Sequence, residues 1–179
     1  MTFGAISSDQ VLTRAIHFSG AQFGKGGTAP TDVLLGTSPE VPALLFDAIA
    51  ETASVYTSFL PDMDLSQDMT VMVQFALVNV QLNGDVLDLT INYVVPIAGT
   101  TASGPTKTST QLTPTRTVTT GEGLAIGDVY EITTTISAGD ATNPLSGGGG
   151  IAIEIHLTNL TDVAAIHVLD ADLEYIALY

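Results

Sequence analysis

Four oxygen-bearing side chains in one short segment have the spacing of a calcium-binding loop. They occupy alternate positions, as the first ligands of such a loop do: Asp62, Asp64, Ser66 and Asp68. The sixth position should be Gly and the twelfth Glu, but this chain has Gln67 and Val73 there. The segment therefore favours a solvated polar turn. We predict no metal site and keep Asp62, Asp64 and Asp68 as the calcium candidates.

The histidines offer a second kind of chemistry. None of the three has a second His, or a Cys, at metal-ligand spacing, and we interpret all of them as surface residues: His17, His156 and His167. A Ser-His-Asp triad stays open because its members converge only in space, although the Gly-x-Ser-x-Gly elbow of hydrolases is absent. We predict no catalytic residue and no enzyme. Asp170 and Asp172 precede the expected last strand, as strand-end acids or as a further calcium candidate.

Carboxylates and tyrosines could act on sugars. Asp and Glu total 19, but glycoside hydrolysis needs two at a defined separation, and no element places such a pair. Trp is absent, so an aromatic platform for a sugar would use one of the tyrosines: Tyr56, Tyr93, Tyr130, Tyr175 or Tyr179. By alternation, Tyr93, Tyr130 and Tyr175 are expected in the core or at an interface. The four glycines at 147–150 lack the Lys-Ser/Thr of a P-loop and indicate a turn.

Composition limits the possible partners. The chain of 179 residues is 45% apolar, which suits one globular domain over residues 1–179. No apolar run approaches the ~20 residues of a membrane helix, and no signal peptide is evident, so we expect synthesis in a cytoplasm. Cysteine is absent, which excludes disulfides and thiolate chemistry, and we predict no cofactor. A net charge of −15 argues against nucleic acid and anionic membranes, and favours solubility or a saline environment.

These side chains must be positioned by strands. Thr and Val are abundant, and Gly and Pro interrupt the chain at short intervals, which predicts an all-β, antiparallel, jelly-roll-like sandwich of about eight to ten strands with at most one short helix. Residues 42–51 fit a helix or a strand equally well. We expect 70–95 to form a hairpin around the turn Asn83-Gly84-Asp85. Residues 113–119 alternate Thr, as in a solvated edge strand or a polar loop.

The closing segment has the clearest period of two. Buried positions are expected at Ile151, Ile153, Ile155 and Leu157, and again at Leu173, Tyr175, Ala177 and Tyr179. The segments 59–64, 70–95, 151–156 and 169–179, with an acidic connector around Asp162, together resemble single β-sandwich virion proteins of tailed bacteriophages. In that group a Leu-Pro-x-x-Asp corner precedes the middle hairpin, as at Leu60-Pro61 and Asp64, and the chain closes on Tyr.

The resemblance implies a particle component without enzymatic activity. We therefore predict a virion protein, a capsid decoration or minor capsid protein that contacts the major capsid protein and forms homo-oligomers, with a trimer favoured. The loop residues Val33, Leu34 and Leu35 would be covered by a neighbouring subunit. The alternative is a carbohydrate-binding sandwich module of a tail fibre or receptor-binding protein, which predicts exposed tyrosines on one face and a bound calcium. A glycan-depolymerising enzyme is a third possibility.

Overall fold

The computed structural model describes residues 11–79, 82, 84–96, 109–117, 126–158 and 165–178. Several predicted features fall outside these ranges: Asn83, residues 118 and 119 of the segment with alternating Thr, the connector around Asp162, and Tyr179. A single domain over 1–179 stays a prediction, since part of the chain lies outside the described ranges. Among the described residues, no helix is long and apolar enough to cross a membrane.

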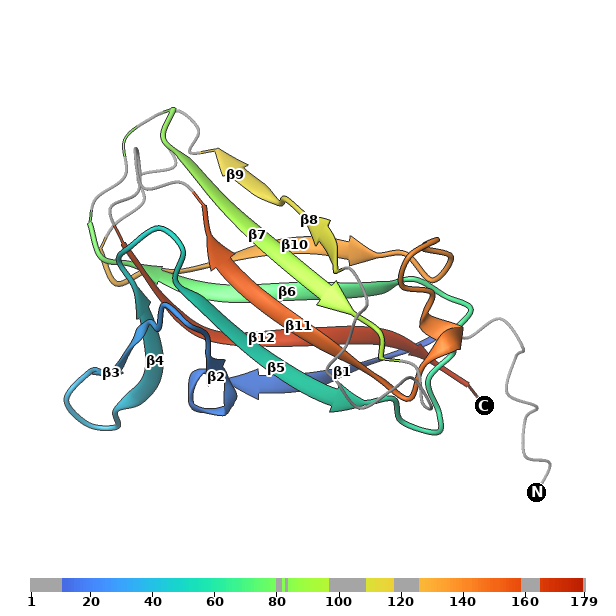
Figure 1. Ribbon diagram of the computed structural model, residues 1–179. Helices are drawn as coiled ribbons and strands as arrows, with labels where there is room; N and C mark the ends of the chain where they lie inside the picture. The colour runs from blue at the N-terminus through green and yellow to red at the C-terminus, as the bar shows by residue number, and fades with distance from the viewer. Residues whose placement is uncertain are drawn as a thin grey trace, which may run out of the picture.

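The chain forms two antiparallel sheets of six strands each, packed face to face (Figure 1). Sheet A has the order β10-β6-β12-β4-β3, with β1 also pairing with β12; its strands are β1 (Leu12–Ser19), β3 (Thr31–Leu35), β4 (Val41–Phe46), β6 (Met69–Leu77), β10 (Val129–Ile136) and β12 (Ile166–Ala177). Sheet B has the order β2-β5-β11-β7-β8, with β9 also pairing with β7; its strands are β2 (Gly24–Lys25), β5 (Thr52–Ser58), β7 (Val86–Val94), β8 (Thr110–Leu112), β9 (Thr115–Thr117) and β11 (Gly150–Leu157).

The predicted all-β antiparallel sandwich is therefore confirmed. The described residues contain two short 3-10 turns and no α-helix: η1 (Gly20–Gln22) and η2 (Leu145–Gly147). More strands form than the eight to ten expected. The additional strands β2, β8 and β9 are only two or three residues long, which is too short for an alternating pattern to predict them. The ambiguous segment 42–51 is strand β4 followed by a turn. Buried Glu51 closes that turn by accepting hydrogen bonds from the Asp47 and Ala48 amides at 2.7 and 3.0 Å.

Alternating apolar residues fill the space between the sheets. The odd-numbered residues of β11 are buried as predicted, and so are the corresponding residues of β12: Leu173, Tyr175 and Ala177. Buried side chains from both sheets belong to one hydrophobic cluster, which includes Phe46, Phe75, Leu89 and Ile91. Since successive residues of a strand face opposite ways, the polar residues between them face outward on both sheets.

The predicted hairpin over residues 70–95 is wrong. β6 pairs with β10 and β12 in sheet A, whereas β7 pairs with β11, β8 and β9 in sheet B. Of the predicted turn, the described residues show the Asp85 amide donating a hydrogen bond to the Leu82 carbonyl at 3.1 Å, and Gly84 with a positive φ of 95°. The intervening segment carries the chain from one sheet to the other. Each strand buries its apolar face against the opposite sheet, so the pattern alone did not identify the partner.

Strand β12 is longer than predicted. It runs from Ile166 to Ala177 and pairs with β4, β6 and β1 at the centre of sheet A. An irregularity in its register lies between Val168 and Asp170, which restores the alternation after an extra residue. Asp170 and Asp172 therefore lie within the strand and not before it, on the outer face of sheet A.

Candidate functional site

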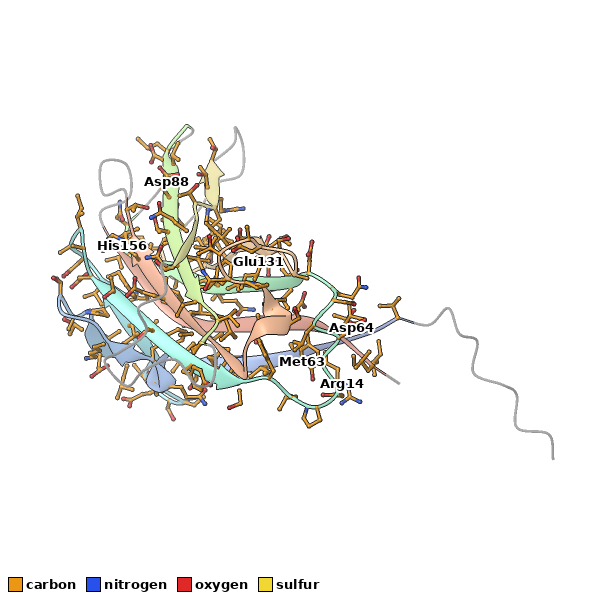
Figure 2. The ribbon with its side chains drawn as sticks, turned by 45° about the vertical axis from the view of Figure 1, so that its right-hand side comes forward. Arg14, Met63, Asp64, Asp88, Glu131 and His156 are labelled. Atoms are coloured by element: carbon orange, nitrogen blue, oxygen red, sulfur yellow. The ribbon has the colours of Figure 1, made fainter. Side chains whose placement is uncertain are left out.

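The three calcium candidates are each engaged by different parts of the protein. Asp62 Oδ2 lies 2.6 Å from an Arg14 guanidinium nitrogen. Asp64 Oδ1 accepts hydrogen bonds from the Ser66 amide and hydroxyl at 3.0 and 2.6 Å, and Asp68 Oδ1 accepts one from the Ala138 amide at 2.8 Å. No group of three or more His, Asp or Glu side chains that could hold a metal occurs among the described residues. Figure 2 shows Asp64 and Arg14 at the end of the sandwich away from Asp88 and His156.

The histidines occupy separate structural positions. Exposed His17 has its Nδ1 2.9 Å from Asp172 Oδ1, across the β1–β12 pair. Half-buried His156 accepts a hydrogen bond at Nε2 from the Ala50 amide at 3.2 Å, so it holds the turn between β4 and β5. Burial lowers the pKa of His167 below its ordinary value. The fold therefore distributes these three residues over both sheets and does not gather them.

One tyrosine of the described residues is strongly exposed. Tyr93 and Tyr175 are buried, as predicted. Tyr130 packs against Phe75, with a distance of 6.1 Å between the two ring centroids. Tyr56 points outward from β5 and is 56% exposed. An exposed aromatic ring on a sheet face offers an apolar platform with a polar rim.

Tyr56 lies on the outer face of sheet B, where strand register forms two rows of side chains across the strands. The apolar row contains Tyr56, Ala152 and Val94, from β5, β11 and β7. The polar row runs beside it and contains Ser54, Glu154, Asn92 and Gln111, from β5, β11, β7 and β8. Adjacent strands are about 4.8 Å apart, so each row presents a group at regular intervals across the sheet.

A shallow groove of about 230 Å³ follows part of these rows, with Tyr56 and Gln111 outside its lining. Its lining includes Ser54, Asn92, Val94, Ala152 and Glu154, and Ser109 closes one side. Asn92 donates its amide hydrogen to Glu154 Oε1 at 2.9 Å, which fixes the carboxylate in the middle of the polar row. The groove therefore combines a positioned acceptor, neighbouring amide and hydroxyl groups, and an apolar strip.

Small residues on β11 create the space that Tyr56 occupies. A Cβ added at Gly150 would lie 2.6 Å from the Tyr56 hydroxyl and 2.4 Å from the Thr57 carbonyl oxygen. The tyrosine thus reaches across the neighbouring strand, over Ala152 in register and toward Gly150. The glycine run has a packing role here, beyond the turn that the sequence predicted.

A polar cluster around buried Asn143 supports the β8 side of the groove. Buried Asn143 accepts a hydrogen bond from the Val95 amide at 3.2 Å and donates one to Thr110 Oγ1 at 2.9 Å. Asp140 Oδ1 accepts bonds from the Asn143 amide at 2.5 Å, from Thr142 and from Thr110; the Asn143 bond is the main cause of the lowered pKa of Asp140. Burial raises the pKa of Tyr93 beside this cluster. These contacts fix short strand β8 against β7.

The comparisons with known proteins concern the fold. No protein-family model and no curated protein matches the chain. Among solved structures, the CBM36-1 domain of a multidomain xylanase from the hindgut metagenome of Trinervitermes trinervoides has a TM-score of 0.51 at 12% identity, over 89% of this chain and 96% of that domain. The xylan-binding module CBM15 has a TM-score of 0.47 at 13% identity, over 91% of this chain and 97% of that module. A CBM36 module in complex with calcium and xylotriose has a TM-score of 0.45 at 15% identity, over 88% of this chain and 97% of that module.

The prediction of a capsid decoration or minor capsid protein is wrong. The structure that aligns at a TM-score of 0.51 is a carbohydrate-binding module and not a virion protein, which favours the alternative prediction. The sandwich scaffold is shared by both classes, so closing strands that resemble those of phage proteins did not separate them. The predicted trimer and the absence of catalysis stay predictions.

Proposed function

We propose that this protein is a carbohydrate-binding module that holds a polysaccharide chain on the outer face of sheet B. The observation that carries the proposal is the pair of adjacent rows, one apolar and headed by Tyr56, one polar and centred on Glu154. A pyranose ring has apolar C–H faces and hydroxyl groups around its edge. It can therefore pack on the tyrosine while its hydroxyls bond to the carboxylate and amide.

The shape of the site suits an extended ligand. The groove is open and includes the polar row from Ser54 to Asn92, and beyond the groove this row continues in register to Gln111 of β8. A flat, shallow site of this kind can accommodate several linked sugar units. A single small molecule, in contrast, usually binds in an enclosed pocket that buries most of its surface. The sandwich fold shared with the CBM36-1 domain supports the same reading.

The groove favours binding without hydrolysis. Glycoside cleavage by the usual mechanisms needs two carboxyl groups on either side of the bond, about 5–9.5 Å apart. Glu154 is the carboxylate among the described lining residues of this groove. Its amide partner Asn92 orients it as a hydrogen-bond acceptor, which is the role of a binding residue.

Affinity electrophoresis in gels that contain individual polysaccharides tests the proposal. We expect at least one of xylan, β-glucan, mannan and chitosan to retard the protein. Tyr56→Ala should weaken that binding about tenfold, or roughly 1.4 kcal/mol, because the platform is removed. The control is Val129→Ala, which truncates a residue of similar exposure, 55%, on sheet A. No retardation in any gel, or equal retardation of both variants, contradicts the proposal.

A further inference from the structure

We propose that the groove on sheet B selects polysaccharides that contain cationic amino sugars, whose ammonium group pairs with Glu154. This inference rests on the proposed function and deepens it by naming the ligand class. It starts from the charges that surround the two rows. Glu154 is the charged side chain among the described residues that line the groove, and it occupies the middle of the polar row.

The cationic side chains of the described residues lie elsewhere and are engaged. Arg14 pairs with Asp62 at 2.6 Å on sheet A. Lys25 Nζ lies 2.6 Å from Asp32 Oδ2. In the β2–β5 pair, Lys25 lies opposite Ala53, whose side chain faces the core. Arg116 stands 5.3 Å above the Tyr130 ring, in register with inward-facing Leu87. None of these three neutralises Glu154 from the outer face of sheet B.

The nearest histidine on this face is engaged by the backbone of the turn after β4. His156 follows Glu154 on β11, and its Nε2 accepts the Ala50 amide hydrogen. The polar row is bordered by Thr52, His156 and Thr90 on one side and by the apolar row on the other.

The whole molecule strengthens this local preference. A net charge of −15 attracts cations and repels polyanions at long range. At short range, a hydrogen bond between an ammonium and a carboxylate is roughly twice as strong as one between neutral groups. Asn92 holds Glu154 in place before a ligand arrives, so little conformational freedom is lost on pairing. Neutral sugars gain neither of the two charge terms, and uronic acids are opposed by both.

Two oligosaccharides of one backbone isolate the charge. Calorimetry with a glucosamine oligomer and with its fully N-acetylated counterpart should show at least about tenfold tighter binding of the glucosamine oligomer. The preference should shrink as salt is added. Glu154→Gln should remove it, because the amide keeps the shape and loses the charge. Glu174→Gln, on the outer face of β12 in sheet A, makes the same change in net charge and should leave the preference intact.

The outcomes separate this inference from the proposed function. Equal or weaker binding of the glucosamine oligomer, or a preference that survives Glu154→Gln, overturns the amino-sugar inference. If a neutral polysaccharide still binds and loses affinity in Tyr56→Ala, the proposed function stands without it. Loss of the preference in Glu174→Gln as well would mean that net charge alone attracts the oligomer, which also overturns the pairing with Glu154.

Discussion

At the scale of single residues, alternation in the sequence determined which way a side chain points. It placed His156 outward and Tyr93 and Tyr175 inward, as the structure has them. Tyr56 was one of five tyrosines considered as a sugar platform. Glu154 and Ser54 were missed, because their meaning depends on their neighbours across the sheet. Partners such as Asn92, 62 residues away from Glu154, follow from strand order and not from local pattern.

Asp170 is a residue that costs stability at neutral pH. Its Oδ1 is buried, without a hydrogen-bond partner in the described part of the chain, and burial raises its pKa, with nearby Asp172 adding to the rise and His17 opposing it. Below about pH 3.9, where the unfolded carboxyl is protonated, this cost is absent. As the pH rises through the higher folded pKa, the folded state must ionise a desolvated group and stability is lost.

We therefore expect Asp170→Asn to stabilise the protein at pH 7 by a few tenths to about 1 kcal/mol, since the side chain remains partly exposed. The gain should fade as the pH approaches the acid range. Denaturant unfolding at several pH values measures both effects. Glu174→Gln, on the same face of the same strand, serves as the control and should change little. A destabilised Asp170→Asn, or a gain independent of pH, would show that the buried carboxylate is not the cause.

At the scale of elements, strand positions were largely predictable and strand partners were not. The two closing strands, β11 and β12, were expected close to where they form, although β12 begins earlier than predicted. The hairpin over 70–95 was wrong because two apolar strands joined by a turn can also lie in opposite sheets of a sandwich. Long-range pairing of β12 with β1, β4 and β6 has no local signal in the sequence.

The glycine run before β11 offers a test of how this strand is placed. A side chain at Gly150 meets the Thr57 carbonyl and the Tyr56 hydroxyl, whereas one at Gly149 meets nothing within 4 Å. We expect Gly150→Ala to destabilise by about 1–3 kcal/mol and to weaken saccharide binding by displacing Tyr56. Gly149→Ala should stay within about 0.5 kcal/mol. Thermal unfolding and calorimetry of the two variants make the comparison, and equal behaviour of both would refute the packing role of Gly150.

At the scale of the whole molecule, two sheets of similar size expose different outer faces. Sheet A exposes Glu131, carries Asp172 beside His17, and has no aromatic platform among its described outward residues. Sheet B exposes Tyr56 beside the Glu154–Asn92 pair. The fold class followed from composition and period, but the asymmetry between the faces appears only once register aligns side chains from four strands. This asymmetry is why we assign binding to sheet B.

Residue-resolved NMR most directly tests that assignment. Isotope-labelled protein would be titrated with oligomers of glucosamine, N-acetylglucosamine and xylose while backbone amide shifts are followed. We expect at least one oligomer to move amides in 52–58, 90–94 and 150–156, with the outward positions of β6, β10 and β12 unchanged. Shifts concentrated on sheet A, or no shifts with any of the three oligomers, would contradict a saccharide site on sheet B.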